Sequence, residues 1–267
     1  MNRSDIVFLD TSIAIALFIH PIEIKTEIRS KLKRFQLRLT GLVVLQEFSR
    51  RLLKEAKYLL DQLRSKGSYQ KVLSHLQFLP PQSQRKFKIC FSTMVNCFPE
   101  GSDSDRTDRM TYFLEDLLEC GSQELLLNVV DSVVKDVGCA SSSIGIKKTK
   151  NTFRFPSDKC QSHASCGVGE FLRSCCNRNA LVDFLAENRD ELTSELESGL
   201  TALRQLQEPD CSNANALNPC LKFGDVLISL ESRGAGAFIT LNYKESKLLC
   251  KQADQEMIVV PVNPDKL

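Results

Sequence analysis

Short runs of apolar residues near both ends of the chain predict buried strands, whereas apolar residues at helical spacing occupy most of the sequence between them. The run at residues 6–9 ends at Asp10, and Asp10-Thr11-Ser12 offers an N-cap for a helix predicted over residues 13–18. Continuous apolar runs of this length are typical of parallel strands covered on both faces. The first segment therefore predicts a buried strand followed by a helix.

The same pattern continues on both sides of a long middle region. A helix is expected over residues 23–37, then a strand over 38–44 and a long amphipathic helix from Leu45 to about residue 65. Near the other end we expect a helix, a strand, a short helix and a last strand, at residues 223–230, 237–240, 244–252 and 257–260.

The middle region is predicted to be helical. Its apolar spacing indicates helices, separated by proline-containing breaks, at residues 67–78, 81–97, 105–120 and 122–136. Residues 138–167 are rich in Ser, Gly and Lys and are expected to form a loop, and a helix or helix pair is expected from about 168 to 207. Strands are therefore expected only near the two ends.

These elements predict an α/β fold with a small parallel sheet flanked by helices. We expect residues 1–64 and 216–267 to form one discontinuous core, and residues 65–215 to form a large, mostly helical insertion. The length of 267 residues permits either one elaborated domain or two closely packed ones.

The sequence shows no pattern of secretion or membrane insertion. Its apolar N-terminal stretch is interrupted by Asp10 and follows Asp5, so it has neither a basic start nor the length of a membrane span. The eleven cysteines are better explained as reduced thiols or metal ligands than as disulfides, and their odd number argues against full pairing. We therefore expect a cytoplasmic protein with no membrane partner.

Charge is distributed unevenly along the chain, although the net charge is only +2. Residues 1–99 hold 17 Lys and Arg against 7 Asp and Glu, a balance of +10, and residues 100–215 hold 12 against 20, a balance of −8. A basic first third suits a polyanionic partner, because Lys and Arg release counterions at phosphates. It is equally consistent with a basic region that faces the acidic middle of the same chain.

Three acidic residues occupy equivalent places in this scheme. Asp10 ends the first strand, Glu47 follows the second, and Asp225 opens the helix before the third. Ligands gather beyond the carboxyl ends of parallel strands, so these carboxylates are expected to meet and to need a cation such as Mg²⁺ or Mn²⁺. Each also has a simpler role, Asp10 and Asp225 as N-caps and Glu47 as a solvated residue in a first helical turn.

The ordered motifs that contain these residues resemble those of PIN-domain nucleases. They are Val-Phe-Leu-Asp10-Thr11-Ser12, Val-Val-Leu-Gln-Glu47-Phe, Gly-Asp225-Val-Leu-Ile and Phe-Ile-Thr240-Leu-Asn242, followed by a final Ile-Val-Val-Pro strand. The resemblance covers about residues 4–60 and 216–262. Each motif alone is weak, and their order along the chain carries the resemblance.

The resemblance implies a metal-dependent endonuclease, usually an endoribonuclease, that uses Mg²⁺ or Mn²⁺ to position a water for attack on a phosphodiester. It makes Asp10, Glu47 and Asp225 metal ligands, with Asn242 as a fourth catalytic position. Thr11, Ser12 and Thr240 would be auxiliary residues, because their hydroxyls can orient a ligand or a water.

Asn242 departs from the pattern of the family, which commonly has a fourth Asp at this position. The amide oxygen can still ligate a metal, but one negative charge is lost, and Glu245 one helical turn onward would compensate for it. A catalytically weak or inactive PIN-like module that binds nucleic acid or a protein partner is therefore the alternative function. In either case the helices of residues 65–215 offer a surface for a protein partner or for self-association.

Two further groups of residues have the composition of binding sites. Possible structural Zn²⁺ ligands, which are better explained as ordinary thiols and a surface histidine, are Cys160, His163, Cys166, Cys175 and Cys176. Basic residues that suit RNA, with DNA as a second possibility, are Arg50, Arg51, Lys54 and Lys57 after Glu47, and Lys147, Lys148 and Lys150 in the predicted loop. The basic loop is equally consistent with a solvated segment.

Overall fold

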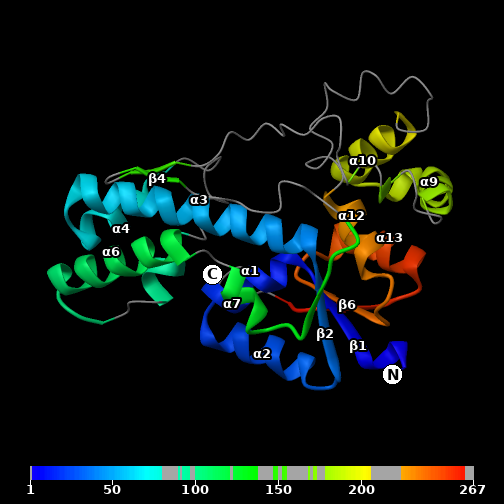
Figure 1. Cartoon of the computed structure of the whole chain (residues 1–267), viewed down its shortest axis with the longest axis horizontal. Coiled ribbons are helices and arrows are strands. Elements are labelled where there is room, and N and C mark those ends of the chain that lie inside the picture. Colours follow the sequence, from blue (N-terminus) through cyan, green and yellow to red (C-terminus); the bar gives the residue numbers. More distant parts are fainter. Residues whose placement is uncertain are drawn as a thin grey trace.

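A parallel sheet flanked by helices forms the centre of the computed structural model (Figure 1). The structure describes residues 2–79, 90, 92–96, 100–120, 123–137, 147–149, 152–154, 168, 171–172, 178–205 and 224–261. All neighbouring strands of the five-stranded sheet are parallel, in the order β3-β2-β1-β6-β7. The predicted α/β class, with a parallel sheet covered by helices, is confirmed.

Strand β1 (Ile6–Leu9) lies in the middle of the sheet, and all four of its residues are buried. It pairs with β2 (Leu37–Gly41) on one side and with β6 (Ala237–Thr240) on the other. The two outer strands are β3 (Ser132–Val134), next to β2, and β7 (Glu256–Val259), next to β6. The predicted strands at residues 6–9 and 237–240 are confirmed, and the strand predicted at 257–260 begins one residue earlier.

The helices divide between the two faces of the sheet. Since β2 and β7 lie on opposite sides of the β1–β6 pair, right-handed crossovers carry the helices after β1 and after β6 to opposite faces. The first group contains α1 (Thr11–Ile19), α2 (Ile22–Leu32), α3 (Leu42–Lys66), α4 (Tyr69–Gln77), α6 (Asp103–Cys120) and α7 (Gln123–Leu127). The second contains α9 (Arg178–Glu187), α10 (Ser194–Gln205), α12 (Gly224–Ser232) and α13 (Tyr243–Ala253).

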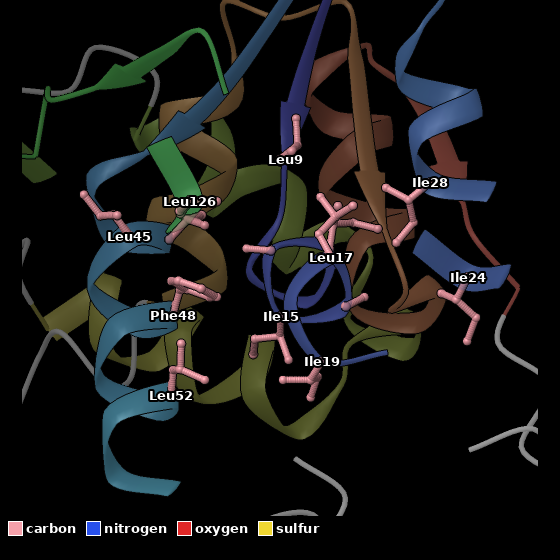
Figure 2. Close-up of a cluster of buried hydrophobic side chains, with 14 of the residues drawn as sticks. Leu9, Ile15, Leu17, Ile19, Ile24, Ile28, Leu45, Phe48, Leu52 and Leu126 are labelled. Carbon is pink, nitrogen blue, oxygen red and sulfur yellow. The ribbon is translucent and has the colours of Figure 1, made fainter. Parts of the chain in front are cut away.

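One large apolar cluster joins the sheet to the first group of helices. Figure 2 shows Leu9 of β1 above Ile15 of α1, with Phe48 and Leu52 of α3 on one side and Ile28 of α2 on the other. The cluster continues along α3 into α4 and α6, which extend beyond the sheet (Figure 1). The long helix α3 is therefore anchored at its first half by the sheet layer and at its second half by other helices.

A second apolar cluster covers the outer side of α12 and α13. Leu200 and Leu203 of α10 pack with Leu227 and Leu230 of α12, and α9 packs against α10. Helices α9 and α10 therefore form a further layer over α12 and α13.

The two ends of the described chain are held together by the first residues. The 3-10 turn η1 (Arg3–Asp5) precedes β1, and the guanidinium of Arg3 donates to the carbonyl oxygens of Ala235 (3.0 Å) and Ala253 (2.7 Å). A second such turn, η4 (Arg189–Glu191), links α9 to α10. Strands from both terminal segments thus belong to one sheet.

Two predicted boundaries at the second strand are wrong. The expected strand at residues 38–44 is β2 ending at Gly41, and Leu42, Val43 and Val44 are already the first turn of α3. A short apolar run does not distinguish a strand from a buried helical turn. The helix expected over 23–37 also stops at Leu32, because the chain must turn before it enters β2.

The expectation that strands occur only near the two ends is wrong as well. The helix predicted over residues 122–136 is the short helix α7 followed by β3, which pairs with β2 at the edge of the sheet. Arg38 and Asp131 fix this pairing: the guanidinium of Arg38 donates to both carboxylate oxygens of Asp131 (2.7 and 2.9 Å). The amide of Asp131 also donates to the carbonyl of Arg38, and the amide of Arg38 to the Asp131 carboxylate (both 2.8 Å).

Part of the predicted loop at 138–167 forms an antiparallel hairpin instead. Its strands β4 (Lys147–Thr149) and β5 (Thr152–Arg154) pair with each other, and Phe153 is buried in the main apolar cluster. The apolar side chain of Phe153 therefore attaches the hairpin to the helical layer.

The helices expected at 67–78 and 105–120 and the helix pair at 168–207 are confirmed in their described parts. Within the described residues, no helix combines the length and the apolar character that crossing a membrane requires.

We expect Asp131→Asn to lower the free energy of unfolding by about 1 kcal/mol at pH 7, since both partners of the pair are partly exposed. The hydrogen bond from Arg38 lowers the pKa of Asp131 below 3.8, so the contribution is full above that pH and is lost as the pH falls through the lowered folded value. Urea denaturation at pH 7 and at pH 3 measures both effects. The control is Glu115→Gln, whose ion pair with Arg64 joins two helices; an equal or larger cost in the control would contradict the role of Asp131.

Candidate functional site

Asp10 lies where the order of the strands reverses. It directly follows β1, whose neighbours β2 and β3 continue to one side of the sheet while β6 and β7 continue to the other. Parallel sheets bind ligands beyond the carboxyl ends of the strands at such a switch point. The amide of Asp10 donates to the carbonyl of Ile239 in β6 (3.2 Å), so the residue is still held by the sheet as helix α1 begins.

Both carboxylate oxygens of Asp10 accept hydrogen bonds. Oδ1 accepts from the amide of Thr11 (2.7 Å), which makes Asp10 the N-cap of α1. Oδ2 accepts from the hydroxyl of Ser12 (2.6 Å) and from the hydroxyl of Thr240 at the end of β6 (2.8 Å). The N-cap role and the role in a strand-end cluster therefore coexist in one side chain.

Backbone amides fix the direction of the two hydroxyls that face Asp10. The amide of Leu241 donates to Ser12 Oγ (3.0 Å), and the amide of Asn242 donates to Thr240 Oγ1 (2.9 Å). Each hydroxyl oxygen thus accepts from the backbone, which leaves its own proton for the carboxylate of Asp10. The strand-end segment after β6 is therefore built around this carboxylate.

Glu47 reaches the same network through Thr11. The hydroxyl of Thr11, which is 5% exposed, donates to Glu47 Oε2 (2.7 Å), while the amide of Thr11 donates to Asp10. Glu47 itself is exposed on the second turn of α3. Thr11 consequently links the carboxylates from the ends of the first two predicted strands, one through its backbone and the other through its side chain.

Asp225 and Asn242 share a surface depression with Asp10. Asp225 is in the first turn of α12, and Asn242 is the N-cap residue of α13, although its side chain does not cap that helix. Glu47 does not line this depression. The structure therefore brings three of the four predicted catalytic residues to one hollow and connects the fourth, Glu47, to Asp10 through Thr11.

Sequence reasoning missed several polar residues of the depression. Ser229 lies one turn after Asp225 on α12, and Ser246 and Cys250 lie one and two turns after Asn242 on α13. The polar spacing of four residues on these two helices was the signal for them. Burial, together with the negative charge of Asp10, raises the pKa of the Cys250 thiol to about 12, so this residue is a protonated thiol at neutral pH.

The basic residues predicted to meet nucleic acid lie along α3, which leads away from the sheet (Figure 1). Arg51 and Lys54 are exposed, Arg50 is half-buried, and Lys57 is half-buried and paired with Asp61. Lys147 and Lys148 belong to strand β4 of the hairpin. Exposed positive charge on α3 thus begins one turn after Glu47.

Some predicted site residues fall outside what the structure describes. These are Lys150, the side chain of Glu245 in α13, and the possible zinc ligands Cys160, His163, Cys166, Cys175 and Cys176. In the described ranges, no three or more His, Cys, Asp or Glu side chains are grouped closely enough to hold a metal ion together. Any cation at the depression would therefore rely on Asp10 and Asp225 with amide, water or substrate oxygens.

We expect Thr240→Val to lower the free energy of unfolding by about 1–3 kcal/mol, because Asp10 loses a donor and the amide of Asn242 loses its acceptor. Thr40→Val is the matched control: Thr40 also lies near the end of a strand and is fully buried, but its hydroxyl donates only to the carbonyl of Leu9. Chemical denaturation compares the two variants. An equal cost would show that the bonds around Asp10 contribute no more than an ordinary buried hydroxyl.

Comparison of the chain with protein-family models, with curated proteins and with solved structures finds no match.

Proposed function

We propose that this protein is a metal-dependent endonuclease of the PIN type that hydrolyses phosphodiester bonds in RNA. The observation that carries the proposal is the depression at the carboxyl ends of β1 and β6, which Asp10, Asp225 and Asn242 line together. These residues come from distant parts of the chain and were singled out by the motifs that resemble PIN-domain nucleases. Their common position at one sheet edge supports that resemblance.

The oxygen donors of the depression fit Mg²⁺ or Mn²⁺. A carboxylate has about four lone-pair positions, and the described contacts of Asp10 use two on Oδ2 and one on Oδ1, which leaves one on Oδ1 for a cation. Asp225 and the amide oxygen of Asn242 are further hard donors. Mg²⁺ is commonly held by one or two carboxylates together with waters and substrate phosphates, so this donor set is sufficient.

The chain's own contribution to hydrolysis is a carboxylate that is in place before any ligand binds. When bound, a divalent cation supplies an activated water and neutralises the charge that develops on the phosphate. Thr11, Ser12 and Thr240 hold Asp10 with bonds of 2.6 to 2.8 Å, so little reorganisation is needed when the depression is occupied. Glu47, bonded to Thr11, adds negative charge beside the depression.

Helix α3 supplies a path for the substrate backbone. Arg51 and Lys54 are exposed on the helix that carries Glu47, one and two turns further from the sheet. Positive side chains one and two helical turns from Glu47 can hold phosphates on either side of the bond to be cut. RNA is favoured over DNA by the resemblance, which implies an endoribonuclease.

A catalytically weak or inactive module that binds nucleic acid or a protein is the second candidate function. It is favoured by the described lining of the depression, which contains two carboxylates, with Asn242 at the position of a usual Asp and Glu47 turned toward Thr11. Such a module would still use the basic residues of α3. The two functions differ in whether Asp10 and Asp225 are required for a covalent change in the substrate.

We expect the wild-type protein to cleave single-stranded RNA with Mg²⁺ or Mn²⁺, and Asp10→Asn and Asp225→Asn each to reduce the rate at least 100-fold, because a cation ligand loses its charge. Gel analysis of a labelled RNA, with and without chelator, measures the rates. Asp183→Asn, an exposed acidic residue on α9, is the control and should cleave as the wild type does.

Cleavage that survives in the Asp10→Asn variant would refute the site assignment. A wild type that binds RNA but leaves it intact with either metal would refute the nuclease and favour the binding module.

We expect the double variant Arg51→Glu/Lys54→Glu to bind single-stranded RNA at least tenfold more weakly, and the slope of log affinity against log salt to fall by about 1.4, because two phosphate contacts are lost. Arg29→Glu/Lys33→Glu, two exposed positions in and just after α2, changes the net charge equally and is the control. Fluorescence anisotropy at several salt concentrations measures both. Equal weakening by the two double variants would mean that only net charge matters.

A further inference from the structure

Helix α3 begins without an N-cap side chain of its own. Its N-cap residue is Gly41, which provides no capping group, and the helix runs for 25 residues from the buried end of β2. The first backbone amides of a helix have no partner within that helix, and leaving such groups buried and unbonded is costly. A partner from another element is therefore required at this position.

Glu231 of α12 provides that partner. Its Oε1 accepts from the amide of Leu42 (3.1 Å) and its Oε2 from the amide of Val43 (3.3 Å), across 189 and 188 positions of the sequence. The side chain is 3% exposed. Both carboxyl oxygens accept from the first amides of α3, so α12 caps α3 from outside.

Gly41 is what allows the carboxylate to come so close. A Cβ atom at this position would lie 1.9 Å from Glu231 Oε2 and 3.1 Å from the ring of Phe8, far inside van der Waals contact. Because Gly41 has no side chain, the buried carboxyl group of Glu231 can lie against it. The contact is a specific junction between the end of β2, the start of α3 and the last turn of α12.

The junction joins the two helices that carry Glu47 and Asp225, two acidic residues of the candidate site. Glu47 is five residues after Leu42 on α3, and Asp225 is six residues before Glu231 on α12. Both helices are continuous over these stretches, so the cap fixes the position of one carboxylate relative to the other. We propose that Glu231 is a positioning residue of the proposed nuclease: by capping α3 from α12, it holds Glu47 and Asp225 in register on either side of Asp10. The inference rests on the proposed function.

The ionisation of Glu231 supplies an independent readout. Burial, opposed by the hydrogen bonds from the two amides and assisted by the negative charge of Asp136, raises the pKa of Glu231 to about 8. Because the pKa is 4.5 without the fold, the folded protein holds a proton on Glu231 that the unfolded chain has lost. The free energy of unfolding therefore falls as the pH rises from about 4.5 to about 8, by at most about 1.4 kcal/mol per pH unit.

The test compares Glu231→Ala with Leu185→Ala, which truncates a fully buried side chain of α9 in the outer helical layer and removes none of the hydrogen bonds of the junction. At a temperature where both variants are folded, we expect Glu231→Ala to lower kcat for RNA cleavage at least tenfold with KM within about twofold. Leu185→Ala should leave kcat within about twofold of the wild type. Equal losses in both variants, or an unchanged kcat in Glu231→Ala, would overturn the positioning role.

Two measurements keep the junction separate from the nuclease. Amide hydrogen exchange at Leu42 and Val43 should accelerate in Glu231→Ala and not in Leu185→Ala, whether or not the protein cleaves RNA. The variant Glu231→Gln should lack the fall in unfolding free energy between pH 4.5 and 8 that the wild type shows. Unchanged exchange, or equal pH slopes, would overturn the junction. A wild type without nuclease activity would overturn the proposed function and the catalytic role of Glu231, while exchange would still decide whether Glu231 docks the two helices.

Discussion

The structure depends on the burial of a single short strand. All four residues of β1 are buried, and both of its edges are paired, with β2 and with β6. A strand in that position needs helices over both faces, and right-handed crossovers supply them only if the strands continue in opposite directions from it. The reversal of strand order at Asp10 follows from this constraint, and so does the meeting of residues from both ends of the sequence.

Much of this arrangement was predictable from local pattern. The apolar runs at residues 6–9 and 237–240 predicted the central strands, because leaving such apolar segments exposed to water costs free energy. Asp10, Asp225 and Asn242 were predictable as neighbours because carboxyl ends of parallel strands share one edge. Strand β3 was not, since Ser132–Val134 is too short to show a period and is fixed as a strand by the distant Arg38.

Two details of the site could not be predicted from the local sequence pattern. Glu47 bonds to the hydroxyl of Thr11 and does not line the depression, and no spacing rule predicts which of two neighbouring acceptors a hydroxyl will choose. Glu231 appeared in the sequence as one more acidic residue on a helix. Its role exists only because Gly41, from another element, leaves room for it.

The contacts around Asp10 and Arg3 span almost the whole described chain. Ser12 and Thr240 are 228 positions apart, and Arg3 and Ala253 are 250 positions apart. Contacts of such sequence separation form late, because the entropy of closing the chain must be overcome first. During synthesis, a nascent chain that ends before α12 has Asp10 and Glu47 but lacks Asp225, Thr240, the amide of Leu241 and Asn242. Whatever chemistry the strand-end cluster performs, it therefore begins only after β6 and the first residues of α13 have left the ribosome.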